Sequence, residues 1–209
     1  MPFRPTTAAA LRRAAIAAPL ATLMLGGCTA SNLLTTSQFY NPASATATPV
    51  LFDRNYTIVG QGSVEKAGVG GAAYFTAMSG SYAAAYGGVI NGSNVGDLMT
   101  SGQAVYSADY EVEVVSGLEI AYDTLQGVAG SDSGNIILTA DFDAATLTGE
   151  DGSLRVDGTI SGEDVTGNVV YAGVEGQLEG LVGQSGTVGA FHGNDARMVY
   201  AGGFAATRP

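Results

Sequence analysis

Hydrophobic and polar residues alternate over much of the second half of the chain, with the two-residue period of a β-strand. In residues 154–160, for example, Leu154, Val156 and Ile160 fall on one face, and polar residues fall on the other. Short stretches of this kind recur at spacings of about 8 to 12 residues, which is typical of a barrel or a sandwich. About seven strands are expected from this pattern, at positions 136–142, 145–149, 154–160, 165–171, 177–182, 187–192 and 198–206.

Small residues occupy many of the expected inward positions, which favours a closed barrel over a flat sheet. They include Ala140, Gly158, Gly167, Gly180 and Ala190. Glycine within a strand permits the bends and close approaches that a small barrel needs, and closure removes unpaired strand edges. The sequence therefore predicts an all-β fold built on a single antiparallel up-and-down β-barrel of about eight strands.

The preceding residues, 49–130, also have β-strand character, but their pattern is less regular. Residues 104–114 alternate between apolar and polar side chains, which predicts an antiparallel strand buried on one face. Residues 72–78 and 81–86 are apolar and are separated by Ser-Gly, so we expect a hairpin there. Shorter strands are expected at 49–53 and 56–59, a turn at Asn91-Gly92, and either a continued strand or a brief helical turn at 117–125.

The N-terminus has the pattern of a secretory signal peptide. Arg4, Arg12 and Arg13 precede an apolar run over residues 14–25, which is shorter than the roughly 20 residues needed to cross a membrane. The run ends in Leu-Gly-Gly-Cys28, which resembles the lipobox of bacterial lipoproteins. The resemblance implies that Cys28, the only cysteine, is acylated and becomes the first residue of the mature protein.

Four segments are expected from these patterns: a lipoprotein signal peptide over 1–27, a lipidated flexible tether over 28–48, an N-terminal β-rich part over 49–130, and the C-terminal barrel strands over 131–209. Residues 29–48 carry no charge and are rich in Ser, Thr and Ala, which is typical of a linker. Thr29 follows the cysteine, where Asp would favour retention in the inner membrane. The lipobox resemblance therefore implies a lipid anchor in the outer membrane, at the cell surface or on the periplasmic face.

The chain is acidic, with 19 Asp and Glu residues against 8 Lys and Arg residues, and its formal net charge is −11. Removal of the signal peptide takes three arginines with it, so the mature protein is still more negative. This charge argues against nucleic acid as a partner. Solubility is the simplest role for it, and attraction of a basic protein or a cationic ligand is the alternative. Because Cys28 is consumed by acylation, the fold depends on its core and not on disulfides.

Residues that carry most enzymatic and metal chemistry are scarce. His192 is the only histidine, Lys66 is the only lysine, and neither a G-x-S-x-G elbow nor a G-x-x-x-x-G-K-[ST] loop occurs. We therefore predict no catalytic residue, no cofactor and no transition-metal site. Carboxylates in expected turns have a spacing unlike that of a calcium loop, so turn chemistry explains them better: Asp132, Glu150, Asp151, Glu163 and Asp164.

Two motifs near the C-terminus carry a family resemblance. Gly189-Ala190-Phe191-His192-Gly193 is followed by Gly202-Gly203-Phe204, and this G-x-F-x-G and G-G-F pair resembles the β-barrel domain of the transferrin-binding protein B family. The segment LTADFDAATLTGEDGSLRVDGTISGEDVTGNV also resembles these barrels. The resemblance covers about residues 134–207, and the chain has room for one such barrel. It implies a lipidated N-terminus, a tether and a barrel that binds host iron-carrying or immune proteins.

Two functional hypotheses follow. The first is an outer-membrane-anchored, non-catalytic surface lipoprotein that binds a protein or small ligand, with iron, haem or nutrient acquisition implied by the family resemblance. The alternative is a structural or adhesive cell-envelope protein without a discrete ligand. Tyr74, Tyr82 and Tyr86 are the candidate partner surface, because tyrosine is favoured at interfaces and these three lie outside the recognised barrel. Packing inside the fold is the other role open to them.

We expect the native protein to be membrane-bound and to carry acyl chains on Cys28, because the lipobox directs lipid attachment to that thiol. Mass spectrometry of the N-terminal peptide from a membrane fraction checks this expectation. An unmodified thiol on a freely diffusing product would contradict it.

Overall fold

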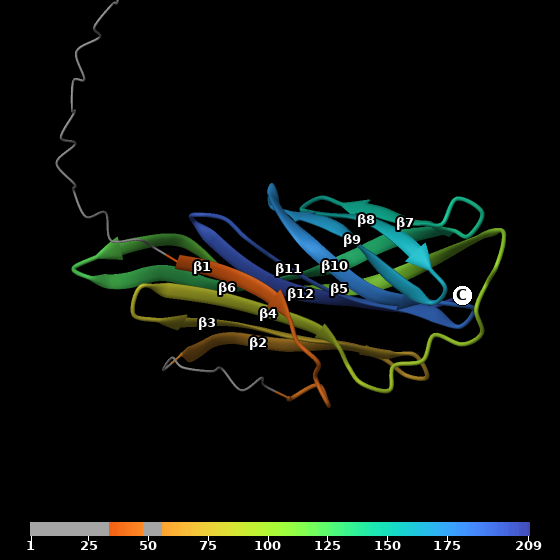
Figure 1. Ribbon diagram of the computed structural model, residues 1–209, viewed down its shortest axis with the longest axis horizontal. Helices are drawn as coiled ribbons and strands as arrows, with labels where there is room; N and C mark the ends of the chain where they lie inside the picture. Colours follow the sequence, from red (N-terminus) through yellow and green to blue (C-terminus); the bar gives the residue numbers. More distant parts are fainter. Residues whose placement is uncertain (1–33, 48–55) are drawn as a thin grey trace, which may run out of the picture. The chain divides into compact units, whose positions relative to one another are not determined.

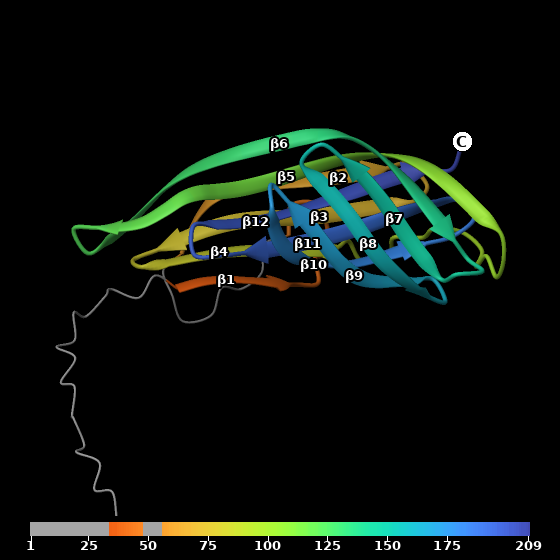
Figure 2. The same ribbon diagram turned by 90° about the horizontal axis from the view of Figure 1, so that it is seen from above.

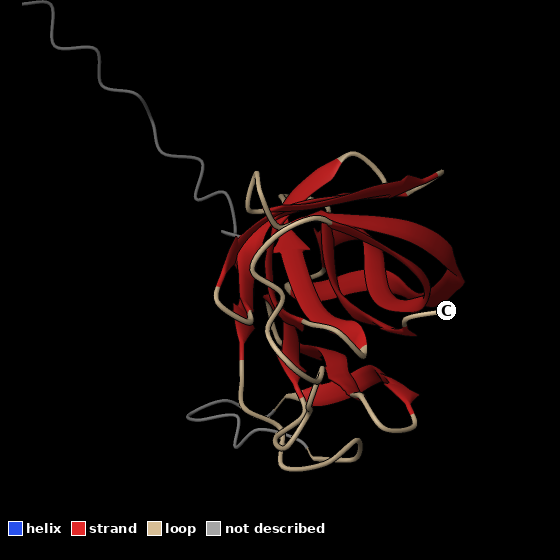
Figure 3. Ribbon diagram, turned by 90° about the vertical axis from the view of Figure 1, so that its right-hand side faces the viewer, coloured by secondary structure: helices blue, strands red, loops and turns tan. Residues whose placement is uncertain are grey.

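The computed structural model describes residues 34–47 and 56–209, and these residues form β-strands joined by turns and loops (Figures 1 and 3). Helices are absent from this part of the chain, which confirms the all-β prediction. The strands are β1 (Leu34–Phe39), β2 (Thr57–Lys66), β3 (Gly70–Ser79), β4 (Tyr82–Val89), β5 (Gln103–Ala121), β6 (Thr124–Asp141), β7 (Thr146–Asp151), β8 (Leu154–Ser161), β9 (Asp164–Tyr171), β10 (Val174–Val182), β11 (Gly186–Asn194) and β12 (Met198–Thr207).

Strands β5 to β12 form a closed antiparallel barrel in which each strand pairs with its neighbours in the sequence (Figure 2). The last strand, β12, closes the barrel by pairing with β5, with Tyr200 opposite Val114 and Phe204 opposite Tyr110. The up-and-down, eight-stranded barrel predicted from the sequence is therefore confirmed. Its strands form because the alternation is regular: in β8, every second residue is buried and the residues between are exposed.

Side chains from all eight strands fill the interior of the barrel. The largest buried residues of this cluster include Tyr106, Ile136, Leu138, Leu147, Leu154, Leu178, Phe191, Tyr200 and Phe204. Hydroxyl groups at its ends find partners: Tyr106 donates to the Gly183 carbonyl at 2.8 Å, and Tyr200 donates to the Val174 carbonyl at 3.0 Å. The barrel is thus a packed core, as is usual for one of eight strands.

A second sheet of four strands, in the order β1-β4-β3-β2, forms a separate layer against the barrel (Figure 1). Strands β2, β3 and β4 are antiparallel, and β1 pairs with β4 in parallel. The sheet packs on the outer faces of β11, β12 and β5 through one apolar cluster whose members include Ala72, Ala83, Ala85, Val188, Ala190, Ala201 and Ala205. A Cβ atom at Gly203 would lie only 2.5 Å from that of Ala72, so the two layers approach closely because glycine stands there.

Two features of the segment boundaries differ from expectation. Residues 34–39, inside the expected tether, form β1 because their backbone pairs with β4. Two side-chain hydrogen bonds join this strand to the barrel. Ser37 Oγ donates to Asn194 Oδ1 at 2.7 Å, and Asn194 Nδ2 donates to Thr35 Oγ1 at 3.1 Å. The barrel begins at Gln103 and not at residue 131, because the half-buried strand expected at 104–114 is the first strand of the barrel.

Several further expectations concern the first half of the chain. The hairpin expected around Ser-Gly is formed by β3 and β4, and the pattern at 117–125 continues the strand, with β5 turning into β6 at Tyr122 and Asp123. Both turn residues have positive φ, 53° and 59°, as a two-residue hairpin turn of type I′ requires. The signal segment, Cys28 and the strand expected at 49–53 lie outside the described residues.

Replacing Leu138 with alanine should lower the free energy of unfolding by about 2 to 5 kcal/mol, because the side chain is fully buried in the barrel. Its neighbour Ile137 points outward and is 52% exposed, so Ile137→Ala is the matched control and should cost about 1 kcal/mol or less. Urea unfolding of both variants measures the difference. Equal losses would contradict the assignment of the inner and outer faces of β6.

Candidate functional site

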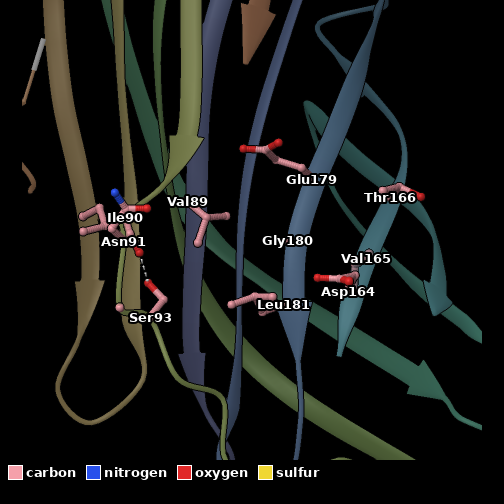
Figure 4. A pocket seen from close by; sticks show the side chains of 11 residues that line it. Val89, Ile90, Asn91, Ser93, Asp164, Val165, Thr166, Glu179, Gly180 and Leu181 are labelled. Atoms are coloured by element: carbon pink, nitrogen blue, oxygen red, sulfur yellow. Dashed lines mark hydrogen bonds between the residues drawn. The ribbon is translucent and has the colours of Figure 1, made fainter. Parts of the chain in front are cut away.

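A pocket of about 430 Å³ lies where the end of β4 meets barrel strands β9 and β10 (Figure 4). We call it the seam pocket. One wall comes from residues 89–93, at the exit of β4, and the other comes from residues 164–166 of β9 and 179–181 of β10. The second sheet and the barrel therefore both contribute to it, and neither layer forms it alone.

The β4 side of the seam pocket is fixed by backbone hydrogen bonds. The Ile90 N–H donates to the Gly71 carbonyl at 2.8 Å, and the Asn91 N–H donates to the Pro42 carbonyl at 2.9 Å. Asn91-Gly92 forms the turn that the sequence predicted, with φ of 85° at Gly92, which glycine adopts without strain. Ser93 then closes the turn by donating its hydroxyl to the Ile90 carbonyl at 2.8 Å. This wall is thus held in place before any ligand arrives.

The barrel side of the seam pocket carries two carboxylates. Glu179 on β10 is half-buried and points towards the segment around Val89, while Asp164 stands at the start of β9 (Figure 4). Burial raises the pKa of Glu179, and a hydrogen bond from the Val89 N–H partly offsets that rise. With Leu181 beside these carboxylates, the pocket can hold a ligand that has an apolar part and a cationic or hydrogen-bond-donating end.

The three tyrosines expected to form a partner surface do not form one. Tyr74 is 1% exposed and faces the barrel, where its hydroxyl donates to Glu111 Oε2 at 2.6 Å. Tyr86 is 8% exposed and stacks on Phe75 on the opposite face of the sheet, with ring centroids 4.7 Å apart. Tyr82 is half-buried at the start of β4. The expectation is corrected because these strands are otherwise rich in Ala and Gly, so large rings are needed to fill the space on either side.

His192 lies on the outer face of the barrel, buried beneath the second sheet. It is 3% exposed, and its ring packs edge-on against Phe39 of β1 with centroids 4.3 Å apart. Neither ring nitrogen has a hydrogen-bond partner among the described residues, so this arrangement offers no Ser-His-Asp geometry there. Burial lowers the pKa of His192 to about 4, which keeps the imidazole neutral at physiological pH.

The acidic residues weighed as calcium ligands are dispersed. Asp132 lies within β6 and not in a turn, where it accepts a hydrogen bond from the Tyr171 hydroxyl at 3.2 Å; Asp151, at the end of β7, accepts one from Tyr110 at 3.3 Å. Over residues 34–47 and 56–209, no three His, Cys, Asp or Glu side chains gather in a way that could hold a metal ion. Asp132 and Asp151 thus serve as acceptors for tyrosine hydroxyls.

Sequence reasoning found the turn of the seam pocket but missed Glu179. Alternation places Glu179 on the outer face of its strand, and nothing in the pattern separates an outward carboxylate in water from one beneath another layer. The apolar run at 72–86 is the signal that points to this second layer. Its residues do not alternate between apolar and polar, which indicates a sheet buried on both faces.

No family model matches the chain, and no curated protein matches its sequence. Among solved structures, the haemoglobin receptor HpuA from Kingella denitrificans, in complex with human haemoglobin, aligns over 66% of this chain and 55% of its own, with 15% identity and a TM-score of 0.39. The isotype 1 transferrin-binding protein B of serogroup B Neisseria meningitidis aligns over 78% and 37%, with 13% identity and a TM-score of 0.45. A surface lipoprotein aligns over 77% and 86%, with 15% identity and a TM-score of 0.44.

The eight-stranded barrel that the sequence resemblance predicts is seen in the structure itself. The chain spans little more than half of the HpuA chain and 37% of the transferrin-binding protein B chain. Over residues 34–47 and 56–209, no helix is long and apolar enough to cross a membrane.

His192 should make the fold sensitive to acid. The pKa of this histidine is 6.5 in the unfolded chain and about 4 in the folded protein. The native state therefore binds the proton less tightly than the unfolded state does. The free energy that neutral, buried His192 contributes to stability is fully present above pH 6.5 and is lost as the pH falls towards 4.

Replacing His192 with phenylalanine removes this titration and keeps a ring against Phe39. Between pH 7.5 and 4.5 the native protein should lose about 2 kcal/mol more stability than the His192→Phe variant. Denaturant unfolding at both pH values measures the difference, and all other titrating groups are common to the two proteins. Parallel losses would show that His192 does not carry the effect.

Proposed function

We propose that the protein is a non-catalytic lipoprotein, held in the outer membrane by acylated Cys28 and displayed at the cell surface, that binds a protein or a small ligand at the seam pocket. The observation that carries the binding role is the combination, in one pocket, of an apolar wall, a half-buried carboxylate and a rim fixed by hydrogen bonds. Concave sites of about 300 to 1,000 Å³ with a few convergent polar groups are the usual form of a ligand site.

The packed interior of the barrel supports binding on the outside of the molecule. An eight-stranded barrel has room either for side chains or for one small ligand. Here the volume is occupied by large buried side chains, among them Tyr106, Phe191 and Phe204. A ligand therefore meets this protein at the loops and at the junction between the two layers, where the seam pocket opens.

Charge and resemblance narrow the class of ligand. The net charge of −11 and the carboxylates of Glu179 and Asp164 favour a basic protein or a ligand with a cationic group. The proposed role in iron, haem or nutrient acquisition rests on the sequence resemblance of residues 134–207 to transferrin-binding protein B barrels. HpuA and transferrin-binding protein B are themselves named for haemoglobin and transferrin binding.

One observation favours the structural or adhesive alternative. Within the described residues, β7 pairs with β6 only from Leu138 to Asp141, while β5 pairs with β6 over most of its length. One edge of β6 is therefore open between Gln126 and Ile137, and open strand edges can pair with another chain. An envelope protein that assembles through this edge would need no pocket.

Full-length protein purified in detergent and immobilised should retain a saturable partner from growth medium or envelope extract. Glu179→Gln should weaken that retention about fivefold or more, because a half-buried charge-assisted contact is lost. Glu175→Gln, on the same strand with the same change in charge but outside the seam pocket, is the matched control. Absence of any saturable partner, or equal effects of the two substitutions, would reject the seam pocket as the binding site.

A further inference from the structure

The tip of the β5–β6 hairpin presents a tyrosine side chain that the fold does not use. Tyr122 is 100% exposed, more than any other large apolar side chain in the described part of the chain. Its φ of 53° is unusual for an aromatic residue, and asparagine or glycine would occupy this turn with less strain. The tyrosine therefore brings neither packing nor a favoured turn conformation to the folded protein. A strained position of this kind indicates a role outside the fold itself.

The hairpin tip lies at the end of the molecule where β1 begins (Figures 1 and 2). Leu34, the first residue of β1, pairs with Tyr82 at the start of β4. The turn just before Tyr82 is joined to β6, because the Gly80 carbonyl accepts a hydrogen bond from the Leu125 N–H at 2.9 Å. Tyr122 stands three residues before Leu125, so it projects from the same end of the molecule as Leu34.

The length of chain between Cys28 and β1 keeps the proposed lipid anchor close to this end. Five residues, 29–33, separate Cys28 from Leu34, and even a fully extended backbone of that length spans only about 20 Å. With the acyl chains of Cys28 in the bilayer, Leu34 is held within about that distance of the lipid. The end of the molecule that carries Tyr122 is therefore the end nearest the membrane.

The side chains at this end suit the surface of a zwitterionic bilayer. Tyrosine favours the membrane interface, where its ring lies among the headgroups and its hydroxyl stays hydrated. Arg197 is exposed in the turn between β11 and β12, and its carbonyl accepts the Leu118 N–H of β5 at 2.9 Å, so a guanidinium group for lipid phosphate lies at the same end. Asp123 and the negative net charge of the chain oppose anionic lipid.

We propose that the tip of the β5–β6 hairpin rests on the phospholipid surface, with the ring of Tyr122 in the headgroup region. This inference rests on the acylation of Cys28 in the proposed function and adds a second contact, which fixes how the protein is oriented. β4 runs from Tyr82 to Val89, so the seam pocket lies about 23 Å from the start of that strand. Contact at the tip thus turns the seam pocket away from the membrane, towards a ligand in solution.

The chain contains no tryptophan, so Tyr122→Trp places a single fluorescent probe at the tip. The acylated full-length protein is reconstituted in phosphatidylcholine vesicles with or without a spin label near the headgroup, and flotation measures attachment. Emission from Tyr122→Trp should fall about twofold or more in the spin-labelled vesicles. Leu98→Trp is the matched control and should be quenched little, because Leu98 is 47% exposed and follows Asp97, whose carbonyl bonds to Gln184 at the opposite end of the barrel.

The outcomes separate this inference from the anchor itself. If neither variant floats with the vesicles, acylation of Cys28 fails and the inference fails with it. Flotation without quenching of Tyr122→Trp, or with equal quenching of the two probes, would overturn the inference and leave the anchor standing. An unquenched tip would then be open to a partner protein in place of lipid.

Tyr122→Asn gives a second test that does not depend on the tryptophan probe. Asparagine accepts a positive φ, so the midpoint of urea unfolding should be unchanged or higher. On vesicles, amide hydrogen exchange over residues 117–127 should be about threefold faster or more than in the unsubstituted protein, because contact with lipid is lost. Exchange over residues 95–102 is the internal control and should not change. Equal exchange at the hairpin in the two proteins would overturn the proposal.

Discussion

The close contact between the second sheet and the outer wall of the barrel is the constraint on which the rest of the structure depends. It is made by alanine, valine and glycine, such as Ala72 and Ala85 on one side and Ala190 and Ala201 on the other. Small side chains let two layers approach until their backbones nearly touch, and dispersion contacts then accumulate over a wide area. The same contact buries His192 and the ring of Tyr74.

The seam pocket follows from this contact, because it lies at the perimeter of the two layers. The seam pocket forms where the chain leaves β4 and no longer covers β9 and β10. Polar residues at the edge of an apolar interface are partly desolvated without being sealed inside it. The pKa of Glu179 is therefore raised by burial, while its carboxylate still lines the pocket.

Much of the fold could be predicted from the sequence, because alternation of apolar and polar residues reports directly which face of a strand is buried. That is why the barrel strands from β7 onward, the strand at 104–114 and the turn at Asn91-Gly92 appear where they were expected. The second sheet could not be separated from the barrel by this signal. Residues 71–77 of β3 are buried without interruption, since one face meets the barrel and the other carries Phe75 and Tyr86.

The candidate site was less predictable for a related reason. Alternation shows that Glu179 faces away from the barrel interior, but it does not show that a second layer lies above it. Tyr74, Tyr82 and Tyr86 were expected at a partner surface because tyrosine carries a polar hydroxyl on an apolar ring. In the structure, the ring of Tyr74 fills the core and its hydroxyl meets Glu111 at the margin.

The closing pair of the barrel has a consequence for how the protein reaches its native state. β12, residues Met198–Thr207, supplies the partner for β5 and also much of the surface on which the second sheet rests. During synthesis from the N-terminus, the barrel cannot close, and the second sheet lacks part of the surface on which it packs, until β12 has been made. Pairings between such distant residues close slowly, on a scale of about milliseconds to seconds for β-rich folds. A polypeptide of this topology therefore keeps its apolar strands exposed for that time after synthesis.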